Sequence, residues 1–435
     1  MSRGDMKQLR RVRLTVSAER AVLVAGVLPG EIEPEEEPLA ELRRLAETAG
    51  AAVVGELVQK LRAPAPRTFI GKGKVAELKR LAAGLDARTA IFDNELTPAQ
   101  LGNIEKATGL KTVDRAELIL GIFASRARSR QAKLQVGLAQ MEYLLPRLPR
   151  MWSHLERQTG GIGVRGGPGE RQIEVDRRQI RRRIKSLKDT LGEISERRER
   201  TVASRDDSYN VSLIGYTNAG KSTLLNALTD ADAFVEDRLF ATLETKTKRL
   251  KLEGGYKVLL SDTVGFIRRL PHDLIESFHA TLEEARTADL LVHVVDGSAP
   301  AAAREMAAVD GVLSELGIAE TDRLVVFNKL DAVADRALLR RMMELHPGSV
   351  AISARTGEGL AGLRQAVTEH AAGGSDSVHL SVHAADGRAL SYIAQHGFET
   401  SRSYDGDRIE ITARMKAGTL EYLLGEYPSV ERASV

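Results

Sequence analysis

The sequence predicts a multidomain α/β protein, because its 435 residues exceed the usual length of one domain and three patterns divide them. Strand-like and helix-like stretches alternate from residue 14 to about 120, heptad spacing of apolar residues follows to about 203, and a strand, a glycine loop and a helix follow one another from Val211. We therefore expect an N-terminal parallel α/β domain (1–124), an antiparallel helical hairpin (125–203), a doubly wound, mostly parallel sheet with a phosphate loop (204–373) and a small C-terminal α/β domain (374–435).

The N-terminal domain is predicted from alternating strand and helix patterns. Pro98 directly after the capping residue Thr97 marks one helix start. The run Gly71–Lys74 lacks the spacing and the Ser or Thr of a phosphate loop, so we interpret it as a tight turn or an RNA contact. The expected elements are strands at 21–27, 52–58 and 89–93 and helices at 39–49, 74–83 and 97–107.

Two long amphipathic segments predict the helical hairpin. Their apolar residues recur in alternating steps of four and three, with one position skipped in the second segment, which is typical of helices packed along a heptad seam. Pro146 and Pro149 should kink or break the first helix. The seam consists of Leu134, Leu138, Met141, Leu145, Leu148, Trp152 and Leu155, and then Ile173, Ile180, Ile184, Leu187, Leu191 and Ile194.

The second of these segments has a strongly basic outer face. Residues 125–200 carry 19 Lys and Arg against nine Asp and Glu, although the net charge of the whole chain is only +3. This asymmetry favours binding to a nucleic-acid backbone over a face that is merely solvated. The predicted RNA-binding residues on this face are Arg177, Arg178, Arg181, Arg182 and Lys185.

The stretch 158–170 between the two segments contains six glycines and cannot hold a core. One interpretation is a flexible connector. The other is a loop that approaches a crowded RNA surface closely, because glycines remove steric bulk. On the second interpretation the contacts are Gly161, Arg165, Gly166 and Gly167.

A phosphate loop is predicted after the strand that begins at Val211. Gly215, Gly220, Lys221 and Ser222 fit the pattern G-x-x-x-x-G-K-[ST], and a helix pattern follows at once. The loop N–H groups and the helix N-terminus should bind phosphates, Lys221 should reach the β- and γ-phosphates, and Ser222 should hold Mg²⁺. The other expected nucleotide-binding residues here are Tyr216, Thr217, Asn218, Ala219 and Thr223.

Three later motifs, each at the end of an apolar strand, indicate a guanine nucleotide. D-x-x-G should hold Mg²⁺ through water with Asp262 and sense the γ-phosphate with Gly265. In N-K-x-D, Asp331 can accept from the two N–H groups of guanine that adenine lacks, a difference that gives strong discrimination. S-A-R could offer backbone amides to guanine O6. The motif residues are Asp262, Thr263, Val264 and Gly265, then Asn328, Lys329 and Asp331, then Ser353, Ala354 and Arg355.

The remaining stretches carry weaker signals. Residues 238–245 contain threonines that are candidates for a Mg²⁺-binding switch residue. His293, within an apolar strand at 290–296, is interpreted as a core residue. Beyond a Gly-Gly-Ser linker at 373–375, strands at 378–383 and 408–413 and a helix at 387–396 are expected, without a chemical motif.

Composition excludes several classes of protein. The absence of cysteine excludes disulfides and thiolate metal sites, and the sequence contains no apolar run of membrane-spanning length. The basic stretch 1–13 lacks the apolar core of a signal peptide. We expect a cytoplasmic monomer with no DNA partner and no integral membrane association.

These motifs together resemble the HflX family, in the Obg–HflX group of translation-related GTPases. The resemblance rests on residues 215–222, 239–243, 262–266 and 328–331 and, more specifically, on the glycine loop 160–170 and on Phe69–Lys74. It implies a GTPase that binds the large ribosomal subunit and its rRNA and splits stalled or idle ribosomes, with the glycine loop reaching toward the peptidyl-transferase centre. The resemblance also implies that Thr242 is the switch threonine that binds Mg²⁺. It further implies that the nucleotide site includes Phe240, Ala241, Thr242, Leu243 and Glu244.

Phe266 bears on the expected mechanism, since it stands where many signalling GTPases place a water-orienting Gln. Slow intrinsic hydrolysis, stimulated by the ribosome, is therefore expected, with Lys221, Thr242 and Gly265 as catalytic residues and Ser222, Thr242 and Asp262 as the Mg²⁺ site. Asn218 could also help to bind K⁺ near the phosphates. Two alternatives remain: a ribosome-assembly or RNA-modification GTPase that binds rRNA without splitting, and a non-enzymatic RNA-binding scaffold.

Overall fold

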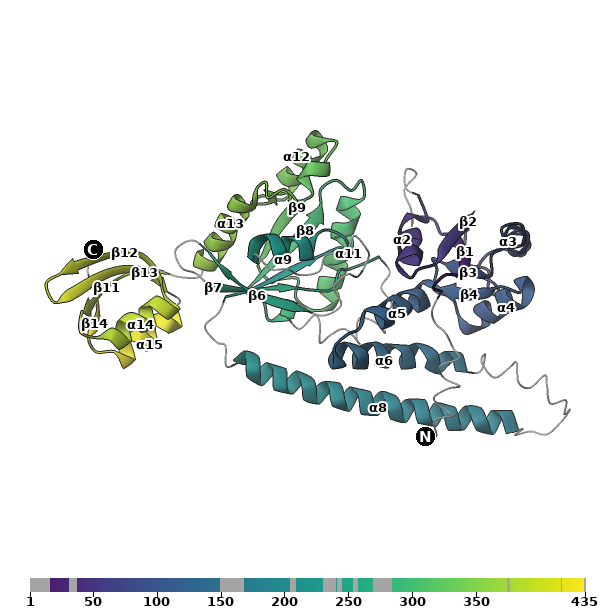
Figure 1. The fold of residues 1–435 in the computed structure, drawn as a ribbon, viewed down its shortest axis with the longest axis horizontal. Helices are drawn as coiled ribbons and strands as arrows, with labels where there is room; N and C mark the ends of the chain where they lie inside the picture. Colours follow the sequence, from purple (N-terminus) through teal and green to yellow (C-terminus); the bar gives the residue numbers. More distant parts are fainter. Residues whose placement is uncertain are drawn as a thin grey trace. The chain divides into compact units, whose positions relative to one another are not determined.

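The computed structural model describes residues 16–30, 37–148, 168–203, 209–229, 240, 245–252, 257–268, 284–373, 376–415 and 417–433 (Figure 1). They form two compact units that meet in sequence between Arg198 and Glu199. Phe240 belongs to the first unit, although it lies within the sequence of the second. No described helix is both long enough and apolar enough to cross a membrane.

The first unit begins with a four-stranded, fully parallel sheet in the order β2-β1-β3-β4. This confirms the predicted alternation of strands and helices. Thr97 and Gln100 form a reciprocal capping box at the predicted helix start. The sheet consists of β1 (Arg20–Val27), β2 (Ala52–Lys60), β3 (Thr89–Phe92) and β4 (Lys111–Asp114), with helices α2 (Ala40–Thr48), α3 (Lys72–Gly84), α4 (Pro98–Thr108) and α5 (Arg115–Arg126).

The run Gly71–Lys74 is a helix start. Gly71 has an extended backbone just before α3, and its N–H donates to Gln59 Oε1 at 2.9 Å. Lys72 and Lys74 therefore lie in the first turn of α3, which begins at Lys72, two residues before the predicted start at Lys74.

The two helices of the predicted hairpin are present. The first is α6 (Arg130–Leu144), which passes into a 3₁₀ turn, η1 (Leu145–Arg147), at Pro146, as a proline in that position predicts. The second is α8 (Pro168–Ala203), which takes in the last three residues of the glycine-rich stretch. Leu138, Leu148, Ile180 and Leu187 of the predicted seam are buried. The connection at 149–167, with Pro149, Trp152 and Leu155, lies outside the described residues.

Helix α6 is fixed to the N-terminal sheet by a buried polar cluster. Asp114, fully buried at the end of β4, accepts hydrogen bonds from Tyr143 Oη at 3.0 Å and from Arg147 Nη2 at 3.3 Å. The Arg147 guanidinium also lies 3.6 Å from the centre of the Tyr143 ring. Burial and the neighbouring carboxylates raise the pKa of Tyr143, so its hydroxyl remains a donor.

The second unit contains a six-stranded sheet in the order β10-β9-β8-β5-β7-β6, in which only β6 runs antiparallel to its neighbour. This confirms the predicted mostly parallel sheet. The strands are β5 (Tyr209–Gly215), β6 (Lys246–Lys251), β7 (Lys257–Asp262), β8 (Leu290–Asp296), β9 (Arg323–Asn328) and β10 (Val350–Ala351), and the helices are α9 (Lys221–Thr229), α11 (Ala302–Glu315), η3 (Leu330–Ala332), α12 (Arg336–Leu345) and α13 (Leu360–Gly373).

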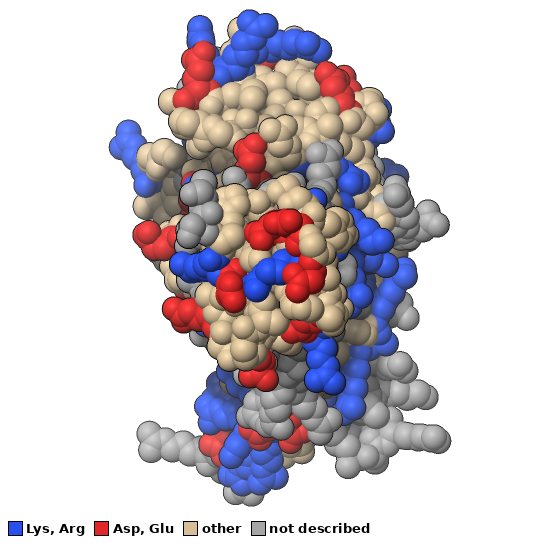
Figure 2. Space-filling view, turned by 90° about the vertical axis from the view of Figure 1, so that its left-hand side faces the viewer, with Lys and Arg blue, Asp and Glu red and all other residues tan. Residues whose placement is uncertain are grey.

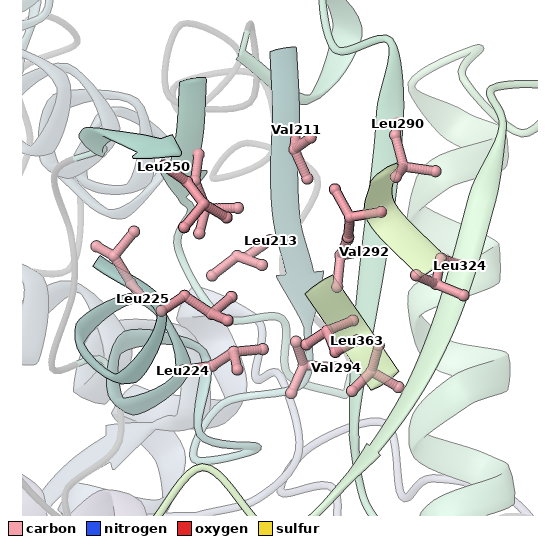
Figure 3. Packing of buried hydrophobic residues seen from close by; sticks show 14 of the residues in the cluster. Val211, Leu213, Leu224, Leu225, Leu250, Leu290, Val292, Val294, Leu324 and Leu363 are labelled. Carbon is pink, nitrogen blue, oxygen red and sulfur yellow. The ribbon is translucent and has the colours of Figure 1, made fainter. Parts of the chain in front are cut away.

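The core of this sheet positions the phosphate loop. Figure 3 shows Leu213 of β5 between Leu224 and Leu225 of α9 and Val292 of β8, with Val211 of β5 beside Leu290 of β8. These side chains are at most 1% exposed, so the end of β5 and the start of α9 are held in a fixed relation. His293, in the same sheet, is a 1% exposed core residue, as predicted.

The last part of the second unit is a β-α-β-β-α-β arrangement with a fully antiparallel sheet in the order β12-β13-β11-β14. Of its elements, β12, α15 and β14 were not predicted. On the face shown in Figure 2, Lys and Arg side chains are interspersed with Asp and Glu. The elements are β11 (Asp376–His383), α14 (Gly387–His396), β12 (Phe398–Asp405), β13 (Arg408–Met415), α15 (Ala417–Glu426) and β14 (Val430–Arg432).

Candidate functional site

The predicted motifs converge at one edge of the six-stranded sheet. Gly215 ends β5, Asp262 ends β7 and Asn328 ends β9. These strands are parallel, so their carboxyl ends lie at the same edge, which is where open α/β sheets bind ligands. Spacing in the sequence predicted each strand end, and the sheet order brings the three together.

The glycines of the phosphate loop are required by close backbone packing. A Cβ on Gly215, whose φ is +142°, would lie 2.1 Å from the Val294 carbonyl oxygen. A Cβ on Gly220, whose φ is +96°, would lie 2.2 Å from Asn328 Nδ2. Asn218 also has a positive φ of 63°, a conformation that Asn tolerates better than most residues. The loop therefore curls tightly enough for its N–H groups to face a phosphate.

Lys221 lies inside this loop. Its Nζ donates to the carbonyl oxygens of Gly215 at 3.0 Å and Tyr216 at 2.9 Å, and the residue is 6% exposed. Burial lowers the pKa of Lys221 to about 8 against the pull of the Asp262 carboxylate. An added phosphate would favour the charged form, so the residue is suited to bind an anion.

Ser222 and Asp262 form the pair expected of a Mg²⁺ site. The Ser222 hydroxyl donates to Asp262 Oδ2 at 2.6 Å, and Asp262 is fully buried at the end of β7. A hydroxyl and a carboxylate are the hard oxygen donors that Mg²⁺ takes together with phosphate oxygens, so these residues fit the ion. Thr263, next in the chain, is fully buried and donates to the Leu213 carbonyl at 2.7 Å, which fixes the start of D-x-x-G to β5.

The D-x-x-G segment is paired to the phosphate loop by backbone hydrogen bonds. The Thr217 N–H donates to the Phe266 carbonyl at 2.7 Å, and the Phe266 N–H donates to the Gly215 carbonyl at 3.1 Å. The Tyr216 hydroxyl accepts from the Arg268 N–H at 2.8 Å. Gly265 therefore lies directly beside the phosphate loop, as its predicted role in sensing the γ-phosphate requires.

Asn328 links the loop to the S-A-R motif. Its Nδ2 donates to the Ala219 carbonyl at 2.8 Å, and its Oδ1 accepts from the Ala354 N–H at 2.9 Å. The side chain is 2% exposed. The Asn of N-K-x-D is thus a buried brace that sets the distance between the phosphate end and the base end of the site.

Asp331 is held by its neighbours at the base end. Its two carboxylate oxygens accept from the Ser353 hydroxyl and from the Arg355 guanidinium. The Ser353 hydrogen bond is the main cause that lowers the pKa of Asp331, so the carboxylate stays ionised. An ionised carboxylate is the acceptor that the two guanine N–H groups require.

Sequence reasoning missed Asp296 at the end of β8. Its Oδ2 pairs with Lys329 Nζ at 2.7 Å, which orients the lysine of N-K-x-D. Lys329 has a positive φ of 63°, and this turn sends the chain from β9 toward Asp331. The sequence signal was the position of Asp296 at the end of an apolar strand, but no motif included this residue, and only the structure shows that β8 pairs with β9.

The switch residues Ala241, Thr242, Leu243 and Glu244 lie outside the described residues, as do Gly161, Arg165, Gly166 and Gly167. Phe240 is described. Its ring is 2% exposed and lies edge-on to Phe123 of α5 within the first unit, with 4.6 Å between the ring centres. The predicted roles of all these residues remain predictions.

The basic residues predicted on the second long helix are all exposed. Arg177, Arg178, Arg181, Arg182 and Lys185 lie on α8 within three turns. Leu187 and Ile180 of the same helix are buried, so the cations occupy the outer side of a packed helix. Their spacing along one side allows contact with several phosphates at once.

Comparison with known proteins identifies the family. The sequence matches the families described as "GTP-binding GTPase N-terminal" over residues 36–124, "GTP-binding GTPase Middle Region" over 126–205 and "50S ribosome-binding GTPase" over 210–329. It is 44% identical to the GTPase HflX of Caldanaerobacter subterraneus subsp. tengcongensis over 97% of this chain and 95% of that protein. The chain belongs to the HflX family of GTPases. The GTPase HflX of Escherichia coli K12 is 42% identical over 87% of this chain and 89% of that protein.

Solved structures also match this HflX family member. A crystal structure of SsGBP with GDP covers 81% of this chain and 98% of its own, with 25% identity and a TM-score of 0.45. A GTP-binding protein of Sulfolobus solfataricus, also crystallised with GDP, matches at 24% identity, over 81% of this chain and 98% of its own, with a TM-score of 0.42. As an HflX family GTPase, the protein binds GTP and GDP and hydrolyses GTP.

Proposed function

We propose that this HflX family GTPase associates with the large ribosomal subunit in the cytoplasm and splits stalled or idle ribosomes in a nucleotide-dependent way. The observation that carries the proposal is the row of exposed cations on α8, Arg177, Arg178, Arg181, Arg182 and Lys185. Such a row neutralises phosphates and releases counterions, which is the main source of affinity for a nucleic-acid backbone. The matched family description, "50S ribosome-binding GTPase", supports ribosomal RNA as the partner.

The nucleotide must change affinity for the ribosome, because a ligand can shift an equilibrium only by binding its states differently. We assign Thr242 and Gly265 to the γ-phosphate, Lys221 to the β- and γ-phosphates, and Ser222, Thr242 and, through water, Asp262 to Mg²⁺. When bound, the ion would neutralise charge on the phosphate oxygens. GTP would order the segments around Thr242 and Gly265, the ordered form would bind the ribosome, and hydrolysis would release it.

Co-sedimentation with purified large subunits tests the proposal. An uncleavable GTP analogue should pellet the protein with the subunits more strongly than GDP does, and the subunits should accelerate GTP hydrolysis. Equal affinity with the analogue and with GDP would refute the nucleotide cycle. Whole ribosomes distinguish splitting from simple binding, because only a splitting factor raises the amount of free subunits. Binding without splitting would favour the assembly or RNA-modification alternative.

A pair of charge-matched variants tests the assigned surface. Arg181→Gln/Arg182→Gln removes two cations from α8, whereas Arg336→Gln/Arg340→Gln removes two exposed cations from α12. The first should weaken binding and reduce the dependence of log Kd on log salt by about 1 for each phosphate that is no longer neutralised. The α12 variant should leave the binding affinity and its salt dependence unchanged. An equal weakening in the two variants would show that net charge, and not the α8 surface, determines binding.

Potassium is a further component of this proposal. Asn218 lies in the loop with a φ of 63° and is half-buried, and its amide oxygen could bind K⁺ near the phosphates. Hydrolysis should then be faster in K⁺ than in Na⁺ at equal ionic strength. Equal rates in the two salts would remove K⁺ from the site.

A further inference from the structure

Thr217 has a buried hydroxyl whose hydrogen-bonding capacity is unused within the described part of the chain. The residue is 6% exposed, and among the described residues its Oγ1 has no hydrogen-bond partner. Buried polar groups nearly always have a partner, and those that lack one require an explanation. The neighbouring Thr263, in contrast, uses its hydroxyl to bind the Leu213 carbonyl.

The position of Thr217 indicates which ligand its hydroxyl would meet. A Cβ built on Gly265 would lie 2.8 Å from Thr217 Cα, 2.9 Å from Thr217 Cγ2 and 2.9 Å from Lys221 Nζ. Thr217, the lysine of the phosphate loop and the glycine of D-x-x-G therefore meet at one point. In a phosphate-loop GTPase the γ-phosphate binds between such a lysine and the N–H of such a glycine. Thr217 thus borders the γ-phosphate position.

The residue after Gly265 offers no side-chain hydrogen-bond donor to the γ-phosphate, so a donor from another residue is needed. Phe266 follows Gly265, is 4% exposed and has no side-chain group that could hydrogen-bond a phosphate or a water. Its backbone holds Thr217 in place, because the Phe266 carbonyl accepts from the Thr217 N–H at 2.7 Å. Many signalling GTPases have a side-chain amide at the position of Phe266. In this protein the backbone of Phe266 instead fixes Thr217, which carries a hydroxyl.

We infer that the Thr217 hydroxyl donates a hydrogen bond to an oxygen of the γ-phosphate of GTP and is a catalytic residue for hydrolysis. In the reaction, a water oxygen bonds to the γ-phosphorus while the bond from phosphorus to the β–γ bridging oxygen breaks. The electron pair of that bond leaves with GDP, and the proton of the water passes to the phosphate product or to solvent. Charge spreads over the γ-oxygens as this happens, so a preorganised donor stabilises the transition state.

Two substitutions separate the hydroxyl from the shape of the side chain. Thr217→Val keeps the branched shape and the methyl contact with Gly265 but removes the hydroxyl, whereas Thr217→Ser keeps the hydroxyl. Single-turnover GTP hydrolysis by the purified full-length protein should slow about 10- to 100-fold in Thr217→Val, the range expected for a hydrogen bond to a charged group. Thr217→Ser should stay within about threefold of the unsubstituted protein. The test needs no ribosome, so its outcome is independent of the proposed partner.

Binding measurements give a second readout where hydrolysis is slow. Thr217→Val should weaken an uncleavable GTP analogue about tenfold while changing GDP affinity by less than about twofold, because only GTP carries the γ-phosphate. Thr229→Val is the matched control, since the Thr229 hydroxyl donates to the Leu225 carbonyl within α9 at 2.7 Å. The inference is overturned if Thr217→Val hydrolyses GTP at the original rate. It is also overturned if GDP and analogue binding fall together with the melting temperature, which would make the hydroxyl a packing element.

Discussion

Replacing Asn328 by Ala should lower the local stability of the nucleotide site. The side chain is 2% exposed and bridges the Ala219 carbonyl and the Ala354 N–H at 2.8 and 2.9 Å. Both partner residues are buried, so the substitution leaves one acceptor and one donor unpaired. Each unpaired buried group costs about 1–3 kcal/mol, which predicts a loss of about 2–6 kcal/mol in the local free energy of opening.

Hydrogen-exchange mass spectrometry is the suitable assay for Asn328→Ala. A chain of two compact units does not have one well-defined free energy of unfolding, whereas exchange reports the stability of individual segments. Peptides that cover the phosphate loop and the S-A-R motif should exchange faster, and those from the first unit should not change. GDP affinity should fall as well, because the phosphate end and the base end of the site lose their common brace.

Two further variants sharpen this prediction. Asn328→Asp keeps an acceptor for the Ala354 N–H but places a carboxylate oxygen against the Ala219 carbonyl, so it should destabilise the site at least as much as Ala does. Asn103→Ala is the control, because its exposed amide donates to the Arg67 carbonyl at 2.9 Å in the first unit. An Asn328→Ala protein whose loop peptides lose less than about 0.5 kcal/mol would refute the bracing argument.

Three other substitutions test the site and its core. Gly220→Ala should abolish tight binding in a fluorescent-GDP titration, since the added Cβ lies 2.2 Å from Asn328 Nδ2, whereas Gly192→Ala, in open space on α8, should bind normally. Burial lowers the Lys221 pKa to about 8, so the unfolded chain binds more protons above that pH. The stability of the free protein should therefore rise from pH 8 toward 10.5 while GDP affinity falls, and Lys221→Gln should remove both trends. Burial lowers the His293 pKa from 6.5 to about 4, so stability should fall as pH drops through that window, by up to about 3 kcal/mol. Hydrogen exchange of peptides from β8, measured at several pH values, would contradict this if His293→Leu kept the same acid sensitivity.

The elements that depend on local pattern were the most predictable. Alternating strands and helices in the N-terminal domain, the capped helix at Thr97 and the helix break at Pro146 all follow from short-range rules of propensity and capping. The five parallel strands of the six-stranded sheet were predicted, because buried parallel strands are continuous apolar runs. Elements without such a run, including β6, in which four of six residues are Lys or Arg, and β14, with three residues, were missed.

Contacts between distant segments could not be read from any one stretch. The pairing of Asp296 with Lys329 depends on β8 and β9 being neighbours, which the order of strands in the sequence does not establish. The packing of Phe240 against Phe123 likewise joins residues that are far apart in the chain. No periodicity marks such pairs, because their partners are brought together only by the topology.

The sequence by itself determined the chemistry of this protein. Four short motifs at strand ends specify a guanine nucleotide, because the spacing of Gly215, Lys221, Asp262 and Asp331 reflects local backbone geometry that few residues satisfy. Only the tertiary structure decided how those motifs act together. Asn328 became a brace, and Thr217 came to face Gly265 and Lys221, because sheet order and close packing fix distances between segments that the chain alone leaves free.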